Sequence, residues 1–195
     1  MKEYNFDQDY YEHGLCHYFA IEMARLYHCP IYFWLDDVWD SEGNPLTVLC
    51  HAFVKLGDGI YVDAYGVFRD ISEREDEFEF NTPEPIIEVC NTLEDAHKFL
   101  KSLGIPFTNV ECKRNAREFL RNNILTLVIN YNGYTYNFSL KGYSKQGNSY
   151  LCSQYNPKTG IVGDFLSMIP KKGIEKGFVS SFDFVPCKGW YYKKS

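Results

Sequence analysis

The sequence contains no long apolar run, no internal repeat and no low-complexity tract. A membrane-spanning helix needs about 20 consecutive apolar residues, and no segment approaches that length. The stretch Met1–Asp7 lacks the apolar core that a secretory signal requires. We therefore expect a folded, cytoplasmic protein without membrane association, and the collagen-like and disordered classes are excluded.

Closely spaced cysteine pairs are also missing, although the chain has seven cysteines. The doublets Cys16-His17, His28-Cys29 and Cys50-His51 contain metal-ligating residue types, but none has the Cys-x-x-Cys spacing of a zinc module. No metal or other cofactor is expected. In a chain without a secretory signal the cysteines are expected to be thiols, and an odd number cannot all pair internally.

The residues that are present favour one domain of ordinary size, or one domain with a small appendage. The chain has 195 residues, of which 45% are hydrophobic and 17% are aromatic. Such a chain is long enough to bury a core, and its many Tyr and Phe residues favour sheet-rich packing.

The net charge of −6 conceals an asymmetry along the chain. Residues 1–123 carry 23 acidic and 11 basic side chains, whereas residues 124–195 carry 3 acidic and 9 basic ones. The stretch 70–95 holds ten acidic residues and one basic residue, Arg74. The run Glu73–Glu77 within it is typical of a solvated loop. Alternatively, the acidic stretch repels anionic partners or packs on the basic half.

The basic half raises a nucleic-acid hypothesis, because it combines lysines such as Lys141 and Lys158 with tyrosines such as Tyr150. No arginine follows Arg121, however, and lysines near turns are the usual solvated edge of a sheet. Nucleic acid is therefore not the expected partner. The oligomeric state is left open.

Helical and strand periodicities both occur before residue 123. The predicted helices are 16–28, 93–103 with Thr92 as N-cap, and 109–122. The predicted strands are 31–35, 48–56, 60–65 and 86–89. Asp36 and Asp37 are expected to end the first strand in solvent. The three tryptophans, Trp34, Trp39 and Trp190, are expected in the core rather than in a substrate groove.

From residue 124 onward the pattern is that of strands. They are predicted at 126–131, 134–140, 150–155, 161–165 and 178–185. Asn132-Gly133 between the first two is a type I′ turn signal. We expect an α+β protein with a core domain over 1–123, which includes the acidic loop 70–95, and a β-rich extension over 124–195. One core shared by both parts is an equally good interpretation.

Three side chains of the first half could form a thiol-based catalytic site. Cys16 opens the first predicted helix, while His51 and Asp63 lie on the two strands of a predicted hairpin. A thiol reacts as thiolate, and both a helix N-terminus and a neighbouring imidazole favour that form. The imidazole also passes a proton to the leaving group, and a third group orients its ring.

The register of this hairpin gives an independent check. A three-residue loop at 57–59 makes His51 and Asp63 diagonal neighbours on one face. The opposite face is then wholly apolar and comprises Ala52, Val54, Leu56, Ile60, Val62 and Ala64. A two-residue loop would mix the faces. The hydrophobic pattern alone therefore selects the register that brings His51 and Asp63 together.

This order of residues resembles the papain-like fold cysteine hydrolases and transferases in their circularly permuted or transglutaminase-like arrangement. The matching stretches are 14–20, 51–54 and 61–66. The resemblance implies an N-terminal helix packed on an antiparallel sheet, with Cys16 as nucleophile, His51 as general base and acid, and Asp63 as orienting carboxylate. It also implies an oxyanion hole made by the backbone N–H of Cys16 and an upstream side chain. The candidates for that side chain are Gln8, Tyr10, Tyr11 and His13.

Two functions follow as expectations. The first is cysteine-nucleophile acyl transfer on an amide or ester, as in a thiol protease or a deamidase, with a protein or peptide substrate. The second is a non-enzymatic binding or inhibitory protein on the same fold, which docks a macromolecular partner. A separate structural interpretation is that Cys16 and His51 are core residues and Asp63 is a strand-end cap or a turn residue. The cysteines expected to be core or half-buried thiols are Cys90, Cys112, Cys152 and Cys187.

Overall fold

The computed structural model describes Tyr11, residues 14–57, 59–75, 78, 80–81, 85–144 and 148–170, and the backbone of residues 179–186. The chain divides into two compact units, residues 1–25 with 29–117 and residues 26–28 with 118–195. This division falls within the last helix, whereas the domain boundary expected from the sequence follows residue 123.

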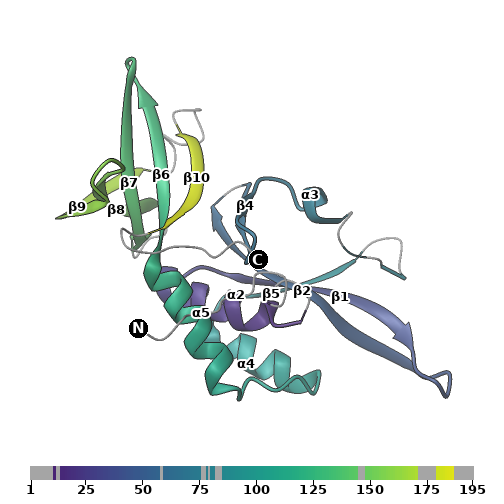
Figure 1. Ribbon diagram of the computed structural model, residues 1–195. Coiled ribbons are helices and arrows are strands. Elements are labelled where there is room, and N and C mark those ends of the chain that lie inside the picture. The colour runs from purple at the N-terminus through teal and green to yellow at the C-terminus, as the bar shows by residue number, and fades with distance from the viewer. Residues whose placement is uncertain are drawn as a thin grey trace. The chain divides into compact units, whose positions relative to one another are not determined.

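The elements follow one another along the chain as Figure 1 labels them. The helices are α2 (Cys16–Tyr27), α3 (Ser72–Glu75), α4 (Leu93–Ser102) and α5 (Val110–Asn122). The strands are β1 (Ile31–Trp39), β2 (Pro45–Gly57), β3 (Ile60–Val62), β4 (Val67–Phe68), β5 (Ile86–Cys90), β6 (Asn123–Tyr131), β7 (Tyr134–Tyr143), β8 (Ser149–Asn156), β9 (Ile161–Pro170) and β10 (Val179–Pro186). The protein is α+β with sheet-dominated content, as the sequence predicts.

The first unit is built on an antiparallel sheet with the strand order β4-β3-β2-β1-β5. Its longest pair is the β1–β2 hairpin, where the Asp40 carboxylate accepts hydrogen bonds from the N–H groups of Glu42 and Asn44 at 2.9 and 2.8 Å. The prediction that Asp36 and Asp37 end the first strand is wrong, and of the two only Asp37 is exposed to solvent as predicted. β1 continues to Trp39, and Asp36 is only 1% exposed.

The β2–β3 pairing confirms the register that the hydrophobic pattern selects. Val54 pairs with Val62, and Lys55 pairs with Tyr61. An irregularity after Lys55 then makes Gly57 rather than Leu56 the partner of Ile60, so the predicted three-residue loop at 57–59 is wrong. The six residues of the predicted apolar face are all buried. β3 ends at Val62, so Asp63 is the first residue after the strand.

Helices pack on the apolar face of this sheet. Phe33 shares that face with Ala52 and lies against Phe99 of α4, with ring centroids 5.2 Å apart. The hydroxyl of Thr92 caps α4, as predicted, by accepting a hydrogen bond from the N–H of Asp95. Figure 1 shows α4 on the opposite side of the β1–β2 hairpin from α3.

An ion pair between a buried carboxylate and a partly exposed arginine ties α2 to α5. The side chain of Glu22 in α2 is 1% exposed, and its two oxygens accept hydrogen bonds from Arg117 of α5 at 2.7 and 3.0 Å. Such a two-pronged contact fixes both the spacing and the rotation of the helices, because the guanidinium and the carboxylate are both planar.

An aromatic cluster covers the opposite face of the same sheet. Trp34 and Phe53 are fully buried there with Phe68, and Phe78 and Phe80 pack against them. Neighbouring residues of a strand point to opposite faces, so Trp34 lies on the other side of the sheet from Phe33. Both faces of the central strands are therefore covered, one by helix and the other by residues that follow β3.

The second unit is an antiparallel sheet with the strand order β10-β6-β7-β8-β9. β6 and β7 are joined at Asn132 and Gly133, whose φ angles are 50° and 79°. Positive φ at both central residues is the signature of the type I′ turn that the sequence predicts. No helix in the described part of the chain is long and apolar enough to cross a membrane.

The remaining core predictions have mixed outcomes. Trp34 is fully buried, but Trp39 is 73% exposed near the tip of the β1–β2 hairpin, so its assignment to the core is wrong. Cys90, Cys112 and Cys152 are buried thiols, as predicted. Trp190 and Cys187 lie outside the described residues.

The Glu22–Arg117 pair leads to a stability prediction. Replacing Arg117 by Ala leaves the Glu22 carboxylate buried without its main cation, and we expect the free energy of unfolding to fall by about 2 kcal/mol. The matched control is Arg114→Ala on the same helix, because Arg114 pairs with the exposed Glu111 at 3.4 Å. That control is expected to cost less than about 0.5 kcal/mol. Urea unfolding of the two variants measures both values, and equal losses would contradict the assignment.

Candidate active site

Cys16 occupies the first position of α2. The preceding Leu15 accepts hydrogen bonds through its carbonyl from the N–H groups of Tyr18 and Phe19 at 2.9 and 3.5 Å. The N–H groups of Cys16 and His17 belong to the first turn, where a helix has no carbonyl of its own to bond them. Cys16 is 4% exposed. Its sulfur is therefore a buried group at the positive end of a helix.

His51 and Asp63 meet on the aromatic face of the first sheet. The His51 Nε2 atom lies 3.5 Å from Oδ2 of Asp63, and both side chains are fully buried. His51 pairs with Trp34 across the β1–β2 ladder, and its ring stacks on Phe78 with centroids 4.7 Å apart. Because the carboxylate faces Nε2, Nδ1 is the ring nitrogen on the other side.

Asp63 also organises the turn that follows β3. Its Oδ1 atom accepts hydrogen bonds from the N–H groups of Tyr65 and Gly66 at 2.9 and 3.0 Å. Gly66 has a φ of 142°, a conformation that favours glycine. The carboxylate therefore serves as a turn-forming group and as the partner of the His51 ring at the same time.

Arg74 completes the environment of Asp63. Its Nε donates a hydrogen bond to Oδ2 at 2.9 Å, and its guanidinium lies over the ring of Phe68 at 5.3 Å. The sequence suggests a solvated loop around Arg74. Instead Ser72–Glu75 forms α3, and the Glu73 carboxylate accepts hydrogen bonds from the N–H groups of Arg69 and Asp70.

A second buried carboxylate, that of Asp36, binds the chain that follows α3. Oδ2 of Asp36 accepts hydrogen bonds from the backbone N–H and the side-chain amide of Asn81, at 2.6 and 2.8 Å. We refer to the described residues between Tyr65 and Asn81 as the cover segment. Asp63 and Asp36 hold its two ends on the sheet, and Phe78 lies between them on the ring of His51.

The structure brings together two of the three predicted catalytic residues. His51 and Asp63 are in contact, as the hairpin register predicts. In this conformation the imidazole is enclosed by aromatic side chains, so the site is closed to a substrate.

Of the upstream candidates for the oxyanion hole, only Tyr11 lies within the described residues; Gln8, Tyr10 and His13 lie outside them. Tyr11 is buried, and its hydroxyl donates to the carbonyl of Cys112 at 2.7 Å. A hydroxyl has a single proton to donate. Tyr11 is therefore not an oxyanion donor here, and the backbone N–H groups at the start of α2 remain the donors in the described residues.

His17 follows Cys16 in the sequence, but its surroundings indicate a structural role rather than a catalytic one. It is 5% exposed, and its ring lies 4.4 Å from the ring of Tyr18. Burial lowers the pKa of His17 to about 4, against a smaller opposite effect from a hydrogen bond with the Pro106 carbonyl. The ring is therefore neutral near pH 7.

The five other described cysteines are poor nucleophiles. Burial raises the pKa of Cys29 and Cys152 to about 12 and that of Cys90 to about 11. Burial also raises the pKa of Cys50 and Cys112, with nearby carboxylates, Asp36 and Glu111 respectively, adding to the effect. Since the thiolate is the reacting form, these cysteines stay protonated near pH 7.

Arg74 and Asp36 are site residues that sequence reasoning missed. The only available signal for Arg74 is that it is the single base among ten acids in the stretch 70–95. Asp36 carries no such signal, because its partner Asn81 is 45 residues away. Among the described residues no group of three or more His, Cys, Asp or Glu side chains is arranged to hold a metal ion.

Comparisons with known proteins identify no relative of this chain. No known protein family, no curated protein and no solved structure matches the chain.

The buried His17 generates a prediction of pH dependence. The unfolded chain takes up a proton near pH 6.5, whereas the folded chain keeps the ring neutral down to about pH 4. The stabilising contribution is therefore fully present above pH 6.5 and is lost as the pH falls toward 4. Between pH 7 and pH 5 the loss is about 2 kcal/mol. Urea unfolding at both pH values should show this slope in the wild type and not in His17→Gln, and an unchanged slope in the variant would contradict the assignment.

Proposed function

We propose that the protein is a cysteine-nucleophile enzyme that hydrolyses or transfers the acyl group of an amide or ester. The observation that carries this proposal is the contact between His51 Nε2 and Asp63 Oδ2 at 3.5 Å, in a region where both side chains are fully buried. A carboxylate in that position is suited to orient the ring for proton transfer.

The proposed reaction proceeds through a thioester. The Cys16 sulfur attacks the carbonyl carbon, its proton passes to His51, and the backbone N–H groups at the start of α2 stabilise the oxyanion. The carbon–nitrogen or carbon–oxygen bond then breaks, and the leaving group takes the proton from His51. Water or an amine, deprotonated by His51, attacks the thioester and regenerates the thiol.

The ring geometry supports different roles for the two imidazole nitrogens. Asp63 faces Nε2, so Nδ1 would exchange the proton with Cys16. The start of α2 supports the other half of the reaction, since a thiolate at the first helical residue is stabilised by the helix dipole. Cys16 is the nucleophile candidate because it is the first residue of α2.

Turnover requires the cover segment to move, because His51 is fully buried beneath it. Arg74 and Asn81 hold the segment through the carboxylates of Asp63 and Asp36. Displacing Arg74 would remove the ionic contact that holds the middle of the segment, and would leave Asp63 with its hydrogen bonds from the N–H groups of Tyr65 and Gly66 and its contact with His51. The catalytic pair would therefore persist while access opens.

Alkylation by iodoacetamide near pH 7, with the labelled residues mapped by mass spectrometry, tests the nucleophile. Cys50 is the internal reference, because it is half-buried whereas Cys16 is 4% exposed. Exposure alone would make Cys50 react first. Activation of the thiol by the helix and by His51 is expected to make Cys16 react at least about tenfold faster.

The control for this experiment is His51→Gln, whose circular dichroism spectrum verifies folding. This variant is expected to bring the Cys16 rate down to that of Cys50. If Cys16 in the wild type reacts no faster than Cys50, the thiol mechanism is wrong. That outcome would favour the alternative function, a non-enzymatic protein that docks a macromolecular partner.

Arg74 provides a separate test of the closed site. In Arg74→Gln the cover segment loses its ionic contact with Asp63, so the ratio of Cys16 to Cys50 alkylation is expected to rise several-fold. The free energy of unfolding should fall by about 2 kcal/mol, because a buried carboxylate loses its cation. The matched control is Arg69→Gln, an exposed arginine in the same segment. Equal alkylation ratios in the two variants would contradict a role for Arg74 in access.

A further inference from the structure

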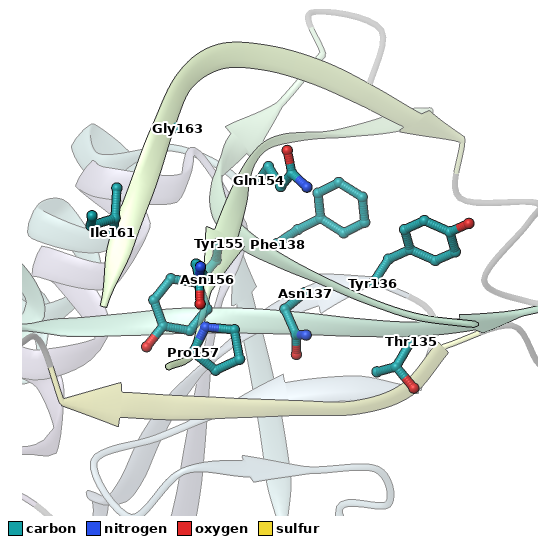
Figure 2. A pocket seen from close by; sticks show the side chains of 10 residues that line it. All are labelled: Thr135, Tyr136, Asn137, Phe138, Gln154, Tyr155, Asn156, Pro157, Ile161 and Gly163. Atoms are coloured by element: carbon teal, nitrogen blue, oxygen red, sulfur yellow. The ribbon is translucent and has the colours of Figure 1, made fainter. Parts of the chain in front are cut away.

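The second unit contains a pocket of about 380 Å³, which is independent of the Cys16 site. It lies where β9 arches over β7 and β8, and Figure 2 shows the side chains that line it. The volume is near the lower end of the range typical of small-molecule sites. Such a pocket accommodates a small ligand or one end of a longer one.

Strand geometry fixes the lining side chains. Tyr136 and Phe138 are two residues apart on β7 and therefore point to the same face. Gln154 of β8 pairs directly with Phe138, so its amide lies beside the aromatic ring. Asn137 and Asn156 also line the pocket, but Asn137 points to the opposite face of β7 from Tyr136 and Phe138 (Figure 2), and the Asn156 amide oxygen accepts hydrogen bonds from the N–H groups of Lys158 and Thr159 at 3.0 and 3.3 Å. Side chains mounted on strands hold their positions better than side chains on loops.

The lining combines aromatic rings with neutral polar groups. None of the described residues around the pocket is Asp, Glu, Lys, Arg or His. A charged ligand would find no counter-charge there, and a wholly apolar ligand would leave the amides without hydrogen-bond partners. A nucleic-acid backbone would need cationic side chains to neutralise its phosphates. The ligand that fits is therefore neutral, polar at its edge and apolar on its faces.

We propose that this pocket binds a neutral saccharide. Each sugar hydroxyl both donates and accepts hydrogen bonds, as does the side-chain amide of Gln154 beside the Phe138 ring. The C–H groups on the face of a pyranose ring carry partial positive charge, which is attracted to the negative face of an aromatic ring such as Tyr136 or Phe138. The pocket thus matches both surfaces of a sugar ring.

Isothermal titration calorimetry of the full chain with three neutral trisaccharides tests this assignment. The probes are maltotriose, cellotriose and triacetylchitotriose, with decaproline as the competing ligand class. At least one trisaccharide is expected to bind with a Kd between about 10 μM and 1 mM. Two variants, Tyr136→Ala and Gln154→Leu, should each weaken that binding about tenfold or more, which corresponds to about 1.4 kcal/mol.

The matched control is Phe165→Ala on β9, because Phe165 is an 89% exposed aromatic residue outside the pocket lining. It is expected to leave the affinity unchanged. The proposal is overturned if no trisaccharide binds, if decaproline binds in their place, or if the pocket variants bind as tightly as the wild type. An equal loss in Phe165→Ala would also overturn it, since binding would then not depend on the pocket.

Discussion

The buried carboxylate of Asp63 is the constraint on which the candidate active site depends. A charge that is removed from water is stable only when other groups replace the lost hydration. Asp63 obtains that replacement from the turn at Tyr65 and Gly66, from Arg74 in the cover segment and from the ring of His51. One side chain thereby fixes the end of β3, the position of the cover segment and the orientation of the imidazole.

The same principle recurs twice in the first unit. Asp36 joins β1 to Asn81, and Glu22 joins α2 to Arg117. Apolar contacts such as those of Phe33 and Phe53 supply the bulk of the burial, but they are non-directional. The three buried carboxylates supply directional contacts, since the hydrogen-bond donors around each one fit only one arrangement of the segments that they join. They connect segments that are far apart in sequence, and for that reason they determine how the layers of the unit are assembled.

The separation in sequence also explains which features could be predicted. The β2–β3 register, the Thr92 cap and the Asn132-Gly133 turn follow from residues a few positions apart, and all three predictions are confirmed. Asp36 was misassigned because its adjacent acid and the nearby turn residues suggest a solvated strand end, whereas its partner Asn81 is 45 residues away. Arg74 was assigned to a solvated run for the same reason. Local patterns cannot identify a donor that only the tertiary fold supplies.

The two proposed sites differ in the physical basis of their selectivity. The Cys16, His51 and Asp63 site depends on ionisable groups that are kept from water, so its chemistry is governed by protonation and by the position of the cover segment. The pocket of the second unit has no acidic, basic or imidazole side chain in its lining, so recognition there depends on shape and on neutral hydrogen bonds. A saccharide bound by amides and aromatic rings would present no charge to the protein. Binding of a neutral ligand in the second unit therefore adds no charge that would alter the proton balance of His51.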